Sequence, residues 1–82
     1  MENLRYLDLT SNKITNKGGL SITKIGTLGN LYLSHNKIQA CIAIRLSSLP
    51  ELKVLDLRFN DIEKEEKSEV KNKSPENLQI FV

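Results

Sequence analysis

An eleven-residue pattern recurs three times along the chain at a constant interval of 24 residues. Leucine occupies the first, fourth and sixth positions of every copy, asparagine the ninth and isoleucine the eleventh. The copies are Leu4–Ile14, Leu28–Ile38 and Leu52–Ile62, and a partial fourth copy, Leu78–Val82, starts 26 residues after Leu52. A fixed period of this length predicts a repeat architecture, in which each repeat buries its apolar face only against its neighbours.

Each copy also contains the alternation of a β-strand with one buried face. Its second and third leucines are separated by a single residue, which is the period of two that such a strand requires. One short strand cannot bury its leucines alone, so we expect the repeats to stack their strands into a parallel sheet with a shared core. The leucine pairs are Leu7 and Leu9, Leu31 and Leu33, and Leu55 and Leu57, with Asp8, Tyr32 and Asp56 between them.

The segments that connect the predicted strands differ from one another. Residues 20–28 favour a short helix that begins after Gly18 and Gly19, and we interpret these glycines as turn residues. Residues 39–50 predict a second helix that ends at Pro50. The inward face of that helix would consist of Ile42, Leu46 and Leu49.

A third connecting segment, residues 63–75, contains four acidic residues, four lysines and one large apolar residue, Val70. Glu63 and Lys67 form one pair at helical spacing, which stabilises a helix by only a few tenths of a kcal/mol, at roughly 0.2–0.5. A frayed helix and a polar loop are both compatible with this composition. In either case we expect the segment to form an exposed face.

The pattern L-x-x-L-x-L-x-x-N-x-I resembles the leucine-rich-repeat family over nearly the whole chain. The resemblance implies an α/β solenoid, a right-handed superhelix with a short parallel sheet on its concave face and short helices or loops on its convex face. It also implies a buried ladder formed by Asn12, Asn36 and Asn60. The segment Ile14–Leu20 is similar to the cytoplasmic, ribonuclease-inhibitor-like branch of the family.

We expect a single repeat domain over residues 1–82, divided at about 4–27, 28–51, 52–77 and a partial 78–82. Solenoids need polar caps, because a terminal repeat otherwise exposes one side of the core. Neither end of this sequence contains such a cap. The sequence therefore predicts a fragment of a longer solenoid, or self-association through the uncapped ends.

Composition argues against several classes of function. The formal charge of +2 is too small for the strong field that a nucleic-acid or anionic-membrane surface usually needs. No signal peptide or apolar run of membrane-spanning length is present. The single cysteine, Cys41, cannot form an internal disulfide, so we expect a reducing, cytoplasmic location.

The chemistry of enzymes and metal sites is also missing. One histidine and one cysteine cannot supply the four ligands of a zinc site, and we expect no metal and no cofactor. The repeat register separates His35 from Cys41, which we expect to be a small buried apolar residue. Asp8 and Asp56 would lie roughly 10 Å apart, two strands from each other, but without a pocket they do not indicate a glycosidase. We predict that the chain is not an enzyme.

The solvent side of the sheet remains as the candidate binding surface, as is usual in families of this resemblance. We expect Tyr6 and Tyr32 to contribute most, because aromatic side chains with a polar tip bring large contact area at low entropic cost. Arg58 beside Asp56 would set charge specificity. The predicted partner-binding residues are Tyr6, Asp8, Asn30, Tyr32, Val54, Asp56 and Arg58, with Ile80 and Val82 on the same side and His35 and Phe59 along the loop edge.

The function predicted from the sequence is a protein–protein interaction module that binds its partner on the concave face. Two alternatives remain. The chain could be the recognition arm of a larger enzyme or effector, or it could serve in ribonucleoprotein assembly. Mixed charges on the sheet, such as Arg58 with Asp56, argue against direct contact with phosphate groups.

Overall fold

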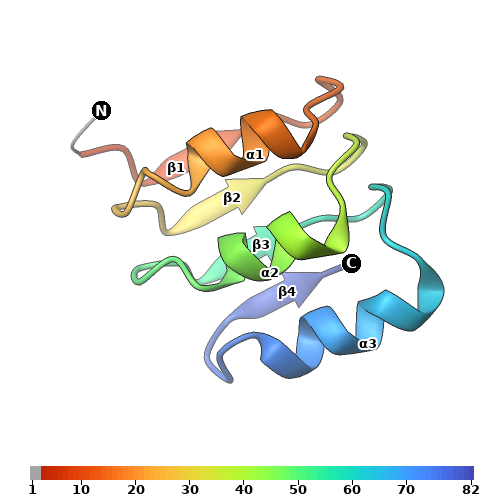
Figure 1. Ribbon diagram of the computed structural model, residues 1–82. Coiled ribbons are helices and arrows are strands. Elements are labelled where there is room, and N and C mark those ends of the chain that lie inside the picture. Colours follow the sequence, from red (N-terminus) through yellow and green to blue (C-terminus); the bar gives the residue numbers. More distant parts are fainter. Residues whose placement is uncertain (1–2) are drawn as a thin grey trace.

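The computed structural model of the chain describes residues 3–82. Strands and helices alternate along these residues, and the strands pair in parallel in their sequence order (Figure 1). The helices lie together on one side of the sheet, so the opposite side, here named the open face, carries no helix (Figure 1). The elements are β1 (Tyr6–Asp8), α1 (Asn16–Ile22), β2 (Asn30–Tyr32), α2 (Ala40–Ser47), β3 (Val54–Asp56), α3 (Lys64–Lys73) and β4 (Gln79–Phe81). The predicted α/β repeat fold with a parallel sheet is confirmed.

The 24-residue period appears directly in the register of the sheet. Leu7 pairs with Leu31, and Leu31 pairs with Leu55, so equivalent positions of successive repeats lie side by side. The pairing continues beyond the strands, since the Leu9 amide donates to the Tyr32 carbonyl at 2.8 Å. Each strand position therefore forms a row that crosses the sheet.

The core lies between the sheet and the helices and is aliphatic. The leucines of the second and third repeats are almost completely buried, whereas Leu7 and Leu9 of the first repeat are only partly buried. No aromatic residue belongs to the buried core of residues 3–82. The largest fully buried apolar side chains are Leu28, Leu31, Leu33, Ile38, Leu46, Leu55, Leu57 and Val70.

The fourth strand has a different register from the one predicted. Leu55 pairs with Ile80 and Asp56 with Phe81, so β4 lies 25 residues after β3. Ile80 and Val82 therefore pack against the core, and their predicted position on the solvent side is wrong. Alternation holds in both registers, but the aliphatic core takes up the two branched side chains and leaves Phe81 43% exposed.

The two adjacent glycines lie inside α1, so the prediction that the helix follows them is wrong. Gly19 is buried, and a Cβ atom at this position would lie 2.6 Å from Cγ2 of Ile42 in α2. Gly18 is similarly close to Ile14, at 2.8 Å from its Cγ2. No glycine in residues 3–82 has a positive φ. These glycines are needed for close packing, not for a turn.

Helix α2 agrees with its predicted apolar face. Ile42 and Leu46 are buried in the helix, and Leu49 is buried just after it. Cys41 is exposed, so its predicted burial is wrong. Adjacent helical residues point about 100° apart, and the inward position of Ile42 directs its neighbour towards solvent.

Helix α3 settles the choice between a frayed helix and a polar loop. Val70 is completely buried and is the single residue of this helix in the core. The Glu63 amide donates to Oε1 of Glu66 at 2.9 Å, which satisfies one of the free N–H groups at the helix start. Lys73 and Glu69 form an exposed pair at 4.0 Å.

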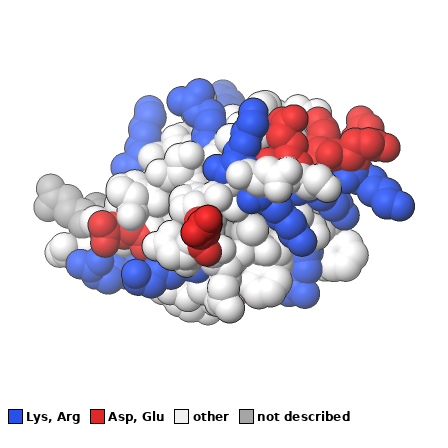
Figure 2. Space-filling model, turned by 90° about the horizontal axis from the view of Figure 1, so that it is seen from below, with Lys and Arg blue, Asp and Glu red and all other residues white. Residues whose placement is uncertain are grey.

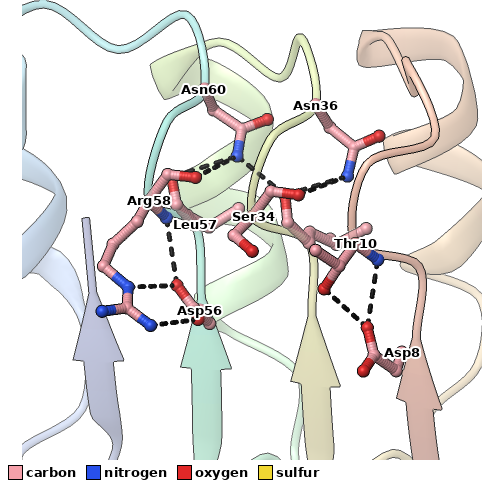
Figure 3. A network of polar contacts seen from close by, with 9 residues as sticks. Asp8, Thr10, Ser34, Asn36, Asp56, Leu57, Arg58 and Asn60 are labelled. Atoms are coloured by element: carbon pink, nitrogen blue, oxygen red, sulfur yellow. Dashed lines mark hydrogen bonds and ion pairs between the residues drawn. The ribbon is translucent and has the colours of Figure 1, made fainter.

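An asparagine side chain follows β2 and β3 at the point where the chain leaves the sheet (Figure 3). Asn36 is 6% exposed; its Nδ2 donates to the carbonyls of Leu9 and Leu33, both at 3.0 Å. Its Oδ1 accepts from the amides of Asn12 and Ile14 at 3.0 and 2.7 Å. Each asparagine thus joins its own repeat to the preceding one.

The ladder is complete only where a repeat precedes the asparagine. Asn60 donates to Leu33 of the preceding repeat at 2.8 Å and accepts from the Ile38 amide at 2.9 Å. Asn12 is exposed, and its side chain donates to Thr10 of its own repeat at 3.1 Å. The predicted ladder is confirmed for Asn36 and Asn60, and the predicted burial of Asn12 is wrong.

The residue before each asparagine has a left-handed backbone. Ser11, His35 and Phe59 have φ values of 61°, 58° and 61°. Residues with a Cβ rarely adopt this conformation, which costs roughly 1–2 kcal/mol. Its recurrence at three equivalent positions shows that the turn into the ladder requires it in every repeat.

Candidate functional site: the open face of the sheet

The seven predicted binding residues lie together on the open face, in rows set by the strand register. Asn30 lies between Tyr6 and Val54 in the first row, and Tyr32 lies between Asp8 and Asp56 in the second. The corrected register adds two residues that sequence reasoning missed, Gln79 and Phe81, at the ends of these rows. Thr10, Ser34 and Arg58 follow the strands at equivalent positions and form a third row.

Two tyrosines form a pair across β1 and β2. The ring centroids of Tyr6 and Tyr32 are 5.4 Å apart, and the ring planes are inclined by 46°. Tyr6 is 59% exposed. The Asn30 amide group lies 3.4 Å from the Tyr32 hydroxyl, which orients that ring along the strand. The pair presents ring surface to solvent in a fixed arrangement.

An ion pair on β3 is held in a two-pronged geometry (Figure 3). Nε and Nη2 of Arg58 donate to the two carboxylate oxygens of Asp56 at 3.0 and 2.9 Å. The Arg58 amide also donates to Asp56 Oδ1 at 3.1 Å. The hydrogen bond from the Arg58 side chain is the largest cause of a lowered pKa for the Asp56 carboxyl, and burial opposes it. The Arg58 guanidinium also lies over the Phe81 ring, with Cζ 5.5 Å from the centroid.

The equivalent carboxylate of the first repeat has different partners. Oδ1 of Asp8 accepts from the hydroxyl and the amide of Thr10 at 2.6 and 3.0 Å (Figure 3). These two bonds lower the pKa of Asp8, with the hydroxyl contributing most. Within residues 3–82, no ion pair involves Asp8. Asp8 therefore presents an uncompensated negative charge, whereas the charge of Asp56 is neutralised by Arg58.

A second aromatic contact lies at the edge where the strands end. The rings of His35 and Phe59 stack with centroids 4.4 Å apart and planes inclined by 16°. Phe59 is 69% exposed. The predicted position of both residues along the loop edge is confirmed. Their left-handed backbone places them on adjacent turns, beside Arg58.

The arrangement does not favour chemistry by acidic or metal-binding groups. No group of three or more His, Cys, Asp or Glu residues in the described part of the chain could hold a metal ion. The pKa values of Asp8 and Asp56 are both lowered, so neither is kept protonated at neutral pH as a general acid requires. Cys41 begins α2 on the helical side, whereas His35 stacks on Phe59.

Charges of both signs are distributed over the molecule. In the view of Figure 2, basic side chains are spread around the described residues with acidic side chains between them. This distribution differs from the continuous basic surface typical of nucleic-acid-binding domains. No helix among residues 3–82 is long and apolar enough to cross a membrane.

The chain is similar to known proteins over most of its length. A family model described as leucine rich repeat matches residues 2–62. The human protein named leucine-rich repeat-containing protein 36 is 42% identical over 62 residues, which cover 74% of this chain and 8% of that protein. No solved structure matches the chain.

Proposed function

This chain belongs to the leucine-rich-repeat family, and from that premise we propose that it binds a protein partner on the open face of its sheet. Domains of this family generally mediate protein–protein interactions and are typically non-enzymatic. The open face corresponds to the concave face expected from the sequence. The matches concern the family as a whole, and the ribonuclease-inhibitor-like branch stays a prediction.

The observation that supports this proposal best is the position of the aromatic residues. The chain has two tyrosines, two phenylalanines and no tryptophan. All four rings lie on the open face or at its edge, and Tyr6, Phe59 and Phe81 are 59%, 69% and 43% exposed. Aromatic side chains dominate the energetics of cores and interfaces. A chain that packs its core entirely with aliphatic residues leaves its aromatic residues available for an interface.

Contacts within the open face also favour binding. Tyr6 and Tyr32 restrain each other, and Arg58 is held between Asp56 and Phe81. Side chains that are ordered before association lose less conformational entropy on binding, a saving of about 0.5–1.5 kcal/mol for each rotamer-rich side chain. The face is therefore preorganised at two separate places.

The experiment that tests the proposal is selection of a displayed library of random peptides on the immobilised chain. Binding of the recovered peptides is then measured for the wild type and for two double variants. The first, Tyr6→Thr with Tyr32→Thr, removes both rings from the open face and keeps side chains suited to strands. The matched control, Arg45→Ala with Lys67→Ala, changes two exposed residues of α2 and α3.

We expect the tyrosine variant to lose at least tenfold in affinity, since aromatic residues at the centre of an interface commonly contribute 2 kcal/mol or more, roughly. The control variant should bind as the wild type does. Both variants should first show the far-ultraviolet circular dichroism of the wild type. Equal binding by the tyrosine variant, or loss of binding in the control variant alone, would refute the proposed binding face.

A second candidate, the recognition arm of a larger protein, is favoured by one observation. The chain spans only 8% of the length of the human relative that it matches. We propose a cytoplasmic location for the chain, supported by its one unpaired and exposed thiol, Cys41. Sequencing of the complete transcript tests the first idea. Recovery of the tagged chain with a marker of the secretory lumen would contradict the second.

A further inference from the structure

Arg58 provides a template for recognition of a cation within the open face itself. Its guanidinium pairs with Asp56 on β3 and lies over Phe81, which is directly opposite Asp56 on β4. A carboxylate and an aromatic ring at facing positions of adjacent strands thus hold one cation between them. The cation comes from the residue two positions after the carboxylate.

The first repeat has the same carboxylate and the same facing aromatic position, but it has no cation. Asp8 is equivalent to Asp56, and Tyr32 lies directly opposite Asp8 on β2. The position of Arg58 is occupied by Thr10, which donates two hydrogen bonds to Oδ1 of Asp8. The arrangement that binds a guanidinium on β3 and β4 is therefore present on β1 and β2 without the guanidinium.

A second ring enlarges this vacant arrangement. Tyr6 is on the same strand and the same side as Asp8, and its ring is 5.4 Å from that of Tyr32. Because the planes are inclined by 46°, the two rings do not cover each other completely. Tyr6 is 59% exposed, so ring surface beside the carboxylate is accessible to a partner. A cation over a tyrosine face is attracted by the ring quadrupole, and the adjacent carboxylate adds to this attraction.

We propose that Tyr6, Asp8 and Tyr32 form a subsite that binds an arginine side chain of the protein partner. This proposal rests on the proposed function, because it assigns a chemical preference to one end of the open face. Arginine fits better than lysine, since its planar guanidinium can stack on a ring and pair with a carboxylate at the same time. An acidic side chain of the partner would be repelled by Asp8.

The direct test uses a small probe, N-acetyl-arginine methylamide, titrated into the isotope-labelled chain at low ionic strength. Amide resonances are followed by two-dimensional nuclear magnetic resonance. We expect saturable shifts that are largest at Tyr6, Asp8 and Tyr32. The citrulline analogue, which has nearly the same shape and no charge, should cause at least threefold smaller shifts. Shifts that are largest elsewhere, or equal shifts with both probes, would overturn the subsite.

Three variants make this test specific. Asp8→Asn should weaken the probe about threefold, the fold-change of a typical exposed ion pair. Asp61→Asn removes the same charge from an exposed loop position, and it should leave the affinity unchanged. Thr10→Arg should reproduce the Arg58 contacts within the first repeat and abolish the shifts caused by the probe. An undiminished response in Thr10→Arg or Asp8→Asn, with both folded, would contradict the proposal.

The two proposals fail in different ways. Peptides that bind the wild type and require Tyr6 and Tyr32, but that bind Asp8→Asn equally well and show no arginine, would refute the subsite and leave the binding face intact. Peptides that do not require the tyrosines would refute the binding face. In that case a response to the arginine probe would show only that the cluster attracts a cation.

Discussion

Replacement of Asn36 by alanine should destabilise the chain more than the equivalent change at either of the other ladder positions. Its amide group makes hydrogen bonds to five backbone groups, and the side chain is 6% exposed. In Asn36→Ala the Ile14 amide and the Leu33 carbonyl, among others, lose this partner. Each buried polar group without a partner costs about 1–3 kcal/mol. We therefore expect a loss of about 2–5 kcal/mol.

This loss is large for a chain of this size. At roughly 0.05–0.15 kcal/mol per residue, the total stability of a small domain is of the same order as the expected loss. Asn12→Ala removes one exposed hydrogen bond, to Thr10, and should cost less than about 0.5 kcal/mol. Asn60 is half-buried and should fall between the two.

The assay is unfolding in urea followed by far-ultraviolet circular dichroism for the three alanine variants. The expected order of destabilisation is Asn36, then Asn60, then Asn12. The dependence of the free energy on urea should stay constant, because the surface exposed on unfolding does not change. Equal losses for Asn36→Ala and Asn12→Ala would refute the argument, since the asparagines would then act through the local turn and not through bonds between repeats.

Three further predictions concern packing, acid stability and association. Gly19→Ala should destabilise the chain by about 1–3 kcal/mol, because its Cβ would lie 2.6 Å from Ile42; Gly26→Ala, with nothing within 4 Å, should be nearly neutral in the same urea assay. The lowered pKa of Asp56 stabilises the fold above the unfolded carboxyl value of about 3.9. This stabilisation is lost as the pH falls through the folded-state pKa, so the difference in urea midpoint between wild type and Arg58→Gln should vanish in acid; a constant difference would contradict it. Leu20 is 40% exposed on α1, and Leu20→Ser should reduce self-association in sedimentation equilibrium; a wild type that is monomeric at all concentrations would exclude this contact.

The parts of the fold that could be predicted from the sequence are those that repeat. Leu31 and Leu55 confirm each other's strand because the same alternation returns after 24 residues. The fourth strand offered one short apolar run, in which alternation fits two registers equally well. Only packing against the aliphatic core decides that Ile80 points inward and Phe81 outward.

Tertiary contacts also explain the error at the glycines. Two adjacent glycines lower helix propensity by about 1 kcal/mol each, so local preference favours a turn. The close approach of α1 to Ile42 overrides that preference at Gly19. The sequence does not show this distance, because it depends on how two helices 20 residues apart settle on one sheet.

The candidate site was predictable in its membership but not in its pairing. Strand alternation places Asp8 and Asp56 on the same face, and the structure agrees. It does not show that Arg58 neutralises Asp56, or that Phe81 lies under the guanidinium, since both depend on side-chain geometry and on the corrected register of β4. The difference between the two carboxylates therefore became visible only in the structure.

The position of the aromatic rings also determines which spectroscopic signals this protein gives. Absorption, emission and circular dichroism in the near ultraviolet arise from aromatic side chains, and here these rings lie outside the core. Loss of near-ultraviolet dichroism is normally taken as evidence that tertiary packing has loosened. In this chain the same change would report contact with a partner at Tyr6 and Tyr32, while loosening of the leucine core would leave the tyrosine spectrum with little to record.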